Sequence, residues 1–112
     1  MTKIECILRP ERLEDVNAAL EELGMVGLTV SEVRGRGRQR GYVEKYRGME
    51  YQVDLLPKIK VEIVAADARS EEIVSTLLES ARTGKIGDGK IFVYDVEDAI
   101  RIRNEDRGDS AL

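Results

Sequence analysis

The residues best suited to chemistry lie in one short segment, Thr83–Lys90, which we call the glycine loop. It reads Thr-Gly-Lys-Ile-Gly-Asp-Gly-Lys and so holds three glycines and two lysines. Glycine lets backbone N–H groups approach a ligand closely, and lysine adds positive charge. We expect a phosphate ligand, because a turn alone would not need so many glycines. The alternative is a tight turn with solvent-facing lysines, for which Asp88 between glycines is also typical.

The glycine loop falls short of a P-loop, the phosphate-binding motif G-x-x-x-x-G-K-[ST]. Gly84, Gly89 and Lys90 fit the spacing, but Ile91 stands where a Ser or Thr would hold magnesium. The loop also follows an expected helix and precedes an expected strand, whereas a P-loop runs from strand to helix. The sequence therefore predicts phosphate binding without the mechanism of a P-loop NTPase.

A second candidate segment is basic and rich in glycine. Residues 34–48 carry six basic side chains and one acidic one, although the whole chain has a net charge of −4. The run from Gly35 to Gly41 resembles the dinucleotide fingerprint G-x-G-x-x-G, but Arg40 replaces the last glycine and no helix follows. An anion site made of arginines and glycine N–H groups and a solvated basic loop are both consistent with this segment.

Two further features give weaker signals. Arg101 and Arg103 alternate along an expected strand, which by itself indicates no more than an exposed strand face. Tyr46 and Tyr51 lie in the middle of the polar stretch between the second and third expected strands. They are candidates for partner anchors or modification sites, and the alternative is that they pack back on the body.

Composition excludes several classes of function. The chain has no His and one Cys, which excludes His-based triads, most zinc sites and an internal disulfide. Cys6 lies in an alternating apolar stretch, so we expect a buried structural thiol. The acidic net charge argues against direct nucleic-acid binding. Without a long apolar run or signal-peptide pattern, we expect a cytoplasmic protein that does not insert into membranes.

The length of 112 residues predicts one domain, 1–112, with a modest aliphatic core. Alternating polarity predicts strands, and apolar residues at helical spacing predict helices. The expected strands are 3–9, 28–33, 58–63, 91–94 and a short 99–103; the expected helices are 13–23, closed by Gly24, and 70–81, capped by Ser70. Residues 34–55 are too long for an ordinary connection, which is typical of a functional or mobile loop. Residues 104–112 are expected to fray.

This order predicts an α+β fold of the ferredoxin-like βαββαβ type, with a long loop between strands 2 and 3. Four antiparallel strands would carry both helices on one face. Nothing in so small a domain is left to cover the other face. We therefore expect self-association through the face without helices.

Taken together, these segments resemble the PII signal-transduction protein family over essentially the whole chain. Several independent motifs occur in the order and at the spacing of the family. They are the strand-Pro opening, Gly35-x-Gly37-Arg38-Gln39, Tyr46-Arg47-Gly48-x-Glu50-Tyr51, Leu56-Pro57-Lys58, Thr83-Gly-Lys-Ile-Gly-Asp-Gly-Lys-Ile-Phe92 and Arg101-Ile102-Arg103.

The resemblance implies a homotrimer that binds ATP or ADP in the clefts between subunits. The family's T-loop would be about 36–55, its B-loop about 82–90, and its C-terminal loop and tail about 101–112. Arg101 and Arg103 would reach in from the neighbouring subunit. The implied nucleotide-binding residues are Thr29, Gly35, Gly37, Arg38, Val64, Gly87, Asp88, Gly89, Lys90, Arg101 and Arg103.

The resemblance also implies 2-oxoglutarate binding by Gln39, Gly41, Lys58 and Gly87, with Gln39 holding a Mg²⁺ ion that bridges ATP and 2-oxoglutarate. These residue types suit the roles, because lysine pairs with carboxylates and an amide oxygen suits a hard cation. Tyr51 matches the tyrosine that many family members carry as a uridylylation site. Met49 departs from the family's usual small residue before Glu50 and excludes serine phosphorylation there.

The function implied is that of a nitrogen/carbon and energy sensor, not an enzyme. Through the T-loop it would regulate ammonium transporters, a uridylyltransferase, sensor kinases or metabolic enzymes. Two rival hypotheses stay open. A small nucleotide hydrolase on the same fold would show multiple-turnover ATP hydrolysis, with Asp88 as its only clear general base. An RNA-binding module using the Arg-Gly segment would show salt-sensitive RNA binding.

Overall fold

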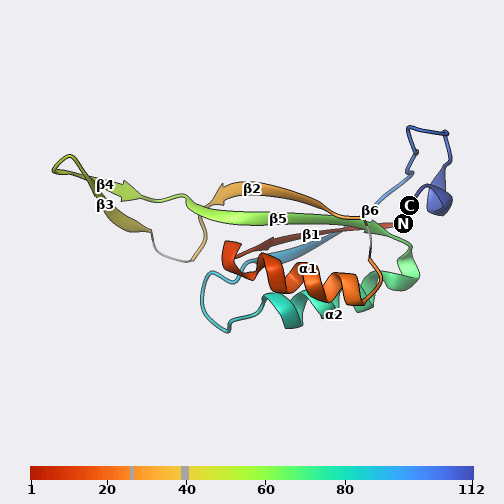
Figure 1. The fold of residues 1–112 in the computed structure, drawn as a ribbon, viewed down its shortest axis with the longest axis horizontal. Coiled ribbons are helices and arrows are strands. Elements are labelled where there is room, and N and C mark those ends of the chain that lie inside the picture. The colour runs from red at the N-terminus through yellow and green to blue at the C-terminus, as the bar shows by residue number, and fades with distance from the viewer. Residues whose placement is uncertain (26, 39–40) are drawn as a thin grey trace.

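The computed structural model describes residues 1–25, 27–38 and 41–112. Figure 1 shows a sheet with helices beneath it and a hairpin projecting far from both. The elements are β1 (Thr2–Leu8), η1 (Pro10–Arg12), α1 (Leu13–Glu22), β2 (Thr29–Gly35), β3 (Tyr42–Tyr46), β4 (Met49–Val53), β5 (Leu56–Ala65), η2 (Asp67–Arg69), α2 (Ser70–Ala81), β6 (Lys90–Asp95) and η3 (Gly108–Ala111).

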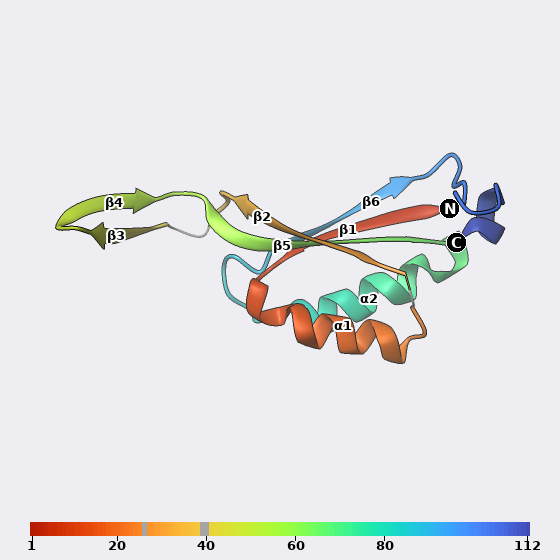
Figure 2. The ribbon, with the colours of Figure 1, turned by 45° about the horizontal axis from the view of Figure 1, so that its top comes forward.

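The main sheet has four strands in the order β2-β5-β1-β6, and every neighbouring pair is antiparallel. Both helices lie on the same face of this sheet, as Figure 2 shows. The α+β ferredoxin-like fold predicted from the sequence is therefore confirmed. Because all connections return along the sheet, the end of β1, the start of β5 and the start of β6 meet at one end of it.

The core lies between the sheet and the two helices. Alternate residues of β1 and β5 point into it, and the apolar stripes of α1 and α2 close it. Its largest fully buried side chains are Ile4, Leu8, Val16, Leu20, Val61, Ile63, Ile73 and Leu77. Cys6 lies in this cluster and is 3% exposed. Burial raises the pKa of its thiol to about 11, which confirms the expectation of a structural thiol.

The start of α2 differs from the sequence prediction. Ser70 is the first residue of the helix and not its cap, and the preceding residues form the short helix η2. Asp67 of η2 instead accepts a hydrogen bond from Thr2 Oγ1 at 2.6 Å and pairs with the N-terminal ammonium at 3.2 Å. The entry to α2 is thus fixed by a tertiary contact with β1, which the local capping pattern does not encode.

The stretch 34–55, predicted as a functional or mobile loop, contains regular strands. β2 extends to Gly35, and β3 pairs with β4 as a two-stranded hairpin, which we call the distal hairpin. Its turn residues, Arg47 and Gly48, both have positive φ, at 52° and 77°, as a tight turn between twisted strands requires. Arg36 and Asp54 form an ion pair at 2.5 Å across its base.

The tail also differs from the prediction. Residues 99–103 form no strand; a single bridge joins Ile100 to Arg107, and Gly108–Ala111 is helical. Arg101 donates to Asp106 Oδ2 and to the Ser110 carbonyl, both at 2.9 Å. Asp98 accepts from Arg107 at 2.7 Å. The tail is therefore a folded-back loop stapled by its own ion pairs, not the frayed end expected from its polar composition.

The face of the sheet without helices carries a network of charges. Lys3 pairs with Glu62 at 3.0 Å and lies over the ring of Tyr94, and the Tyr94 hydroxyl donates to Glu5 at 3.1 Å. The hydrogen bond between Lys3 and Glu62 raises the pKa of the lysine and lowers that of the glutamate. Phe92 lies beside this network and is 45% exposed. Self-association through this face stays a prediction.

Within the described residues, no helix is both long enough and apolar enough to cross a membrane.

Candidate functional site

The glycine loop connects α2 to β6 at the end of the sheet from which the distal hairpin projects (Figures 1 and 2). Its starting point is fixed by Arg12, whose Nε and Nη2 donate to the Ser80 carbonyl at 3.1 and 2.5 Å. Ser80 belongs to the last turn of α2, where carbonyls have no intrahelical partner. Arg12 therefore satisfies the helix end and holds the start of the loop against α1.

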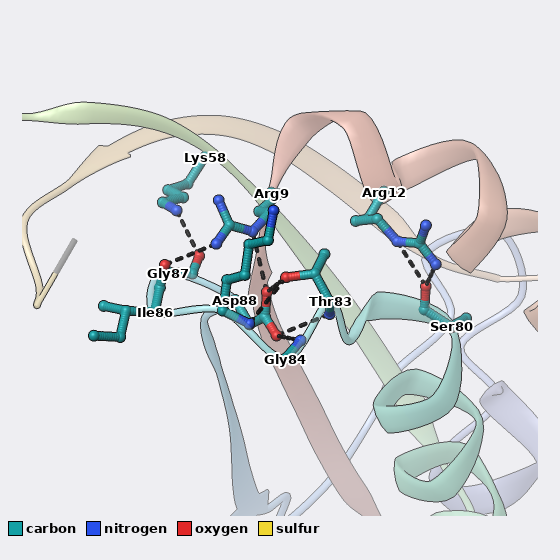
Figure 3. A network of polar contacts seen from close by, with 10 residues as sticks. Arg9, Arg12, Lys58, Ser80, Thr83, Gly84, Ile86, Gly87 and Asp88 are labelled. Carbon is teal, nitrogen blue, oxygen red and sulfur yellow. Dashed lines mark hydrogen bonds and ion pairs between the residues drawn. The ribbon is translucent and has the colours of Figure 1, made fainter. Parts of the chain in front are cut away.

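Inside the loop, the carboxylate of Asp88 accepts hydrogen bonds from the first two residues of the loop, as Figure 3 shows. Thr83 N and Gly84 N donate to Oδ2 at 2.9 and 2.8 Å, and Thr83 Oγ1 donates to Oδ1. Arg9, from the end of β1, donates its Nε to Oδ1 at 3.1 Å. These bonds, led by the one from the Thr83 hydroxyl, hold the pKa of Asp88 well below its usual range.

Two cations hold successive carbonyls of the loop. Arg9 Nη2 donates to the Ile86 carbonyl at 2.8 Å, and Lys58 Nζ donates to the Gly87 carbonyl at 2.7 Å. Leu8 pairs with Ile59 across the antiparallel strands β1 and β5. Arg9 follows Leu8 and Lys58 precedes Ile59, so the two cations lie side by side at the same end of the sheet. Burial, and next the positive charge of Arg9, lower the pKa of Lys58.

This clamp orients the N–H groups that follow. A trans peptide unit directs its C=O and N–H in opposite senses, so the N–H groups of Gly87 and Asp88 point away from the two cations. Within the described part of the chain, the N–H of Gly87 has no hydrogen-bond partner. The N–H of Asp88 closes the hydrogen-bonded turn over Ile86 and Gly87. A preset N–H donor in a lysine-bearing glycine loop is the kind of backbone group that binds anions.

The three glycines of the loop each have a local backbone reason. Gly84, Gly87 and Gly89 have φ values of 87°, 104° and 101°, which L side chains rarely adopt. A Cβ at Gly89 would in addition lie 1.7 Å from the Ile7 carbonyl oxygen. The sequence argument that a turn alone would not need so many glycines is therefore wrong. The anion site is supported by the N–H directions and not by a surplus of glycine.

Comparison with known proteins places this chain in a family. Residues 1–106 match the family model of the nitrogen regulatory protein P-II. The chain belongs to this family. It is 54% identical to the nitrogen regulatory protein P-II of Pasteurella multocida, 53% to that of Rhodospirillum rubrum and 54% to the nitrogen regulatory protein P-II 1 of Escherichia coli. Each match covers 100% of both chains.

In this P-II chain the predicted site residues fall into two groups at opposite ends of the sheet. One group lies beside the clamp and the other near the chain termini (Figures 1 and 2). Thr29 and Gly35 are the two ends of β2, so about 20 Å separates the groups at ~3.3 Å per residue. The first group is Gly35, Lys58, Gly87, Asp88, Gly89 and Lys90; the second is Thr29, Val64, Arg101 and Arg103.

Three of the remaining predicted residues, Gly37, Arg38 and Gly41, lie at the base of the distal hairpin. Gly37 and Arg38 follow β2, and Gly41 immediately precedes β3. Gln39, predicted to ligate magnesium and 2-oxoglutarate, lies outside the described residues. The backbone of Tyr51, the predicted modification site, belongs to β4 and pairs with Glu44.

Sequence reasoning missed Arg9 and Thr83 as parts of this P-II site. Arg9 connects Asp88 to the Ile86 carbonyl, and the Thr83 hydroxyl contacts Asp88. A signal for Arg9 was present, since a basic residue directly after an alternating strand lies at the sheet end where loops converge. The role of Thr83 depends on a contact across the loop that spacing does not reveal.

Proposed function

We propose that this protein is a nitrogen/carbon and energy sensor that binds ATP or ADP and 2-oxoglutarate and regulates target proteins, without being an enzyme. The observation that carries this proposal is the N–H group of Gly87, which has no partner within the described residues and is set by the bond from Arg9 to the Ile86 carbonyl. It forms a preorganised phosphate site with Lys90 close by in the loop. Membership of the nitrogen regulatory protein P-II family supports the assignment to nitrogen signalling.

The two separated groups of residues support a site shared between subunits. One chain cannot bring Arg101 and Arg103 to its own glycine loop, because they follow the far end of β6. A second subunit in a homotrimer would supply them. In this arrangement Gly87, Gly89 and Lys90 hold phosphates from one side, and the arginines hold them from the other. Thr29 and Val64, at the same end as the arginines, flank the adenine.

A 2-oxoglutarate site fits beside the clamp. A depression of about 230 Å³ is lined by Arg9, Pro10, Glu11, Tyr42, Leu56, Pro57 and Lys58. Two cations in its wall suit a dicarboxylate. Lys58 also holds the Gly87 carbonyl, so the residue that would bind 2-oxoglutarate already touches the phosphate loop. Gln39 and Gly41 would complete this site, and the amide oxygen of Gln39 would hold the Mg²⁺ that joins it to ATP.

The nucleotide hydrolase hypothesis is weakened by the state of Asp88. Hydrogen bonds lower its pKa well below the usual range, which makes the carboxylate a poor proton acceptor at neutral pH. Both of its oxygens are also occupied by donors from Thr83, Gly84 and Arg9. A general base for water attack would have to come from elsewhere in the site.

The output would be carried by the distal hairpin. Tyr42, Val43, Tyr46 and Met49 expose large apolar surfaces on it, at 48%, 54%, 61% and 62%. Such side chains can anchor a partner. We propose that ligand state selects the hairpin conformation that docks on ammonium transporters, a uridylyltransferase, sensor kinases or metabolic enzymes, and that Tyr51 is uridylylated. Ordering a segment through a phosphate-linked metal is an established kind of switch.

The first prediction concerns coupling between the ligands. Isothermal titration calorimetry should show 2-oxoglutarate binding with Mg-ATP and little or none without it, because the metal bridges the two ligands. The coupling must be reciprocal, so 2-oxoglutarate should tighten ATP by the same factor. Lys58→Ala should weaken 2-oxoglutarate binding about tenfold or more, since it removes a charged partner, and should weaken ADP binding less.

Lys45→Ala is the matched control, because Lys45 is an exposed lysine of the distal hairpin whose side chain is 76% exposed. It should leave 2-oxoglutarate binding unchanged. Equal binding of 2-oxoglutarate with and without Mg-ATP would contradict the proposed mechanism. An equal loss of both ligands in Lys58→Ala would contradict the role given to Lys58.

A further inference from the structure

Asp88 lies among the residues proposed to hold nucleotide phosphates, yet its side chain carries the same sign of charge as a phosphate. Its two oxygens accept four hydrogen bonds, from Thr83 N, Thr83 Oγ1, Gly84 N and Arg9 Nε. A carboxylate offers about four lone-pair sites in all. Groups of its own chain therefore saturate the side chain, and they leave it no acceptor with which to bind a ligand.

We infer that Asp88 is a positioning residue whose carboxylate fixes the glycine loop in the shape that presents N–H groups to phosphate. The inference rests on the proposed nucleotide site and gives the side chain of Asp88 no contact with the ligand. The backbone N–H of Gly87 is offered to the ligand, and the carboxylate of Asp88 holds the loop.

The contacts close the loop into a ring. The carboxylate joins Asp88 to Thr83 and Gly84, at the point where the chain leaves α2. Arg9 then ties this ring to the end of β1 and, through Nη2, to the Ile86 carbonyl. Gly89 brings the chain within contact of the Ile7 carbonyl, where no side chain would fit. The position of Asp88 is thus fixed from both ends of the loop.

Loss of the charge should disturb this ring without unfolding the body. An Asn at position 88 keeps one oxygen, but its NH₂ group would face donors instead of acceptors. The oxygen that the NH₂ group replaces accepts two hydrogen bonds, so both are lost, and the NH₂ group then faces the two donors that made them. The peptide units of Gly87 and Asp88 then lose their fixed directions, and a ligand must order them at its own cost. We expect nucleotide affinity to fall about tenfold or more.

A different role for the same carboxylate would be to hold Mg²⁺, since the ion prefers carboxylate oxygens. The two roles predict different metal dependence. A positioning residue affects the loop whether or not metal is present, so Asp88→Asn should weaken ADP equally with and without Mg²⁺. A magnesium ligand would matter for Mg-ATP and leave metal-free ADP unaffected.

The experiment measures ADP affinity by calorimetry for the full chain, with Mg²⁺ and with a chelator. Asp88→Asn should be about tenfold or more weaker in both conditions. Thr83→Val should be weaker by a smaller factor, and Thr83→Ser should restore binding. The double variant that combines Thr83→Val with Asp88→Asn should bind ADP no worse than Asp88→Asn, because the Thr83 hydroxyl acts through Asp88. Glu14→Gln, which removes an exposed charge from α1, should match the wild type.

Amide hydrogen exchange without nucleotide gives a second readout. The N–H groups of Thr83 and Gly84 should exchange faster in Asp88→Asn and as in the wild type in Thr83→Ser, with β1 and β5 protected in all variants. Failure of the wild type to bind ADP would remove the proposed function and the role of Asp88 with it. If the wild type binds ADP and Asp88→Asn binds it equally well, or loses affinity only when Mg²⁺ is present, the inference about Asp88 is overturned and the proposed function is not.

Discussion

Cys6 and Asp88 are ionisable residues whose surroundings shift the pKa in opposite directions. The thiol of Cys6 is packed among aliphatic side chains, which disfavours the thiolate and raises its pKa to about 11. Asp88 lies in a ring of donors, which favour the carboxylate and lower its pKa. At neutral pH one group is therefore an inert part of the core and the other a permanent anion that organises a loop.

The pKa of Cys6 predicts a loss of stability at high pH. Below about pH 9 the thiol is protonated in the folded and unfolded states, so it adds no pH dependence. Between its ordinary value of 9.0 and about 11, the unfolded chain releases the proton and the folded chain retains it. The free energy of unfolding should therefore fall as pH rises, by at most about 1.4 kcal/mol per pH unit.

Urea unfolding of wild type and Cys6→Ala at pH 7, 9, 10 and 11 checks this. Lysines and tyrosines titrate in both proteins over this pH range. The informative quantity is therefore the difference in free energy of unfolding between wild type and Cys6→Ala at fixed protein concentration. The stability advantage of the wild type should shrink above about pH 9. A difference that stays constant to pH 11 would show that Cys6 is not the buried neutral thiol described above.

At the scale of elements, the sequence predicts best where side chains face a common core. The alternation of β1 and β5 and the stripes of α1 and α2 follow directly from burial on one side, and these two predicted strands and two predicted helices are confirmed. The distal hairpin was missed because it faces water on both sides and so lacks a one-sided apolar pattern. The positive φ values of Arg47 and Gly48 fit the Arg-Gly pair in the sequence, which is the signal that could have found its turn.

The tail shows the opposite error. Ile100 and Ile102 alternate with Arg101 and Arg103 as in a strand, but ion pairs to Asp98 and Asp106 bend the chain back before a strand can form. Such pairs depend on contacts between charges several residues apart, which periodicity does not register. The clamp of the glycine loop was missed for the same reason, since Arg9 lies 79 residues before Asp88.

The stapled tail gives a prediction of its own. Asp98 accepts from Arg107 Nη1 at 2.7 Å and from Gly108 N at 3.2 Å. Asp98→Ala should therefore loosen residues 99–112 and speed trypsin cleavage after Arg103 and Arg107 several-fold, while the melting temperature changes little, because the tail adds nothing to the buried core. Glu97→Ala, at the exposed neighbouring position, is the control. Equal cleavage rates in the two variants would show that Asp98 does not hold the tail.

At the scale of the whole molecule, the helix-free face of the sheet is a surface that no helix of the chain covers. It presents the network of Lys3, Glu5, Glu62 and Tyr94 with Phe92 beside it. Large apolar surface next to paired charges is typical of an interface core with a polar rim. The division of the candidate site into two groups of residues gives a second reason to expect that subunits associate.

Sedimentation equilibrium tests that association. The wild type should have three times the chain mass of 12.6 kDa. Phe92→Arg should lower the mass, because assembly would bury an extra charge in every subunit, and the chain itself should stay folded, since Phe92 is 45% exposed in it. Leu78→Arg, at a 44% exposed position on α2, should keep the wild-type mass. A wild-type monomer, or an undisturbed trimer in Phe92→Arg, would contradict the interface.

The distal hairpin has a mechanical consequence. Its strand β4 leads into β5 at Leu56, which pairs with Gly35 and is 7% exposed and so anchored in the body. The seven residue steps from Leu56 back to Met49 form a lever arm of at most about 23 Å, at ~3.3 Å per residue. A tilt of about 10° at the pivot would displace the tip by about 4 Å, enough to exchange one set of contacts for another on a close-packed partner surface. The pivot lies beside Lys58, so adjustments too small to alter the body would be magnified where partners meet it.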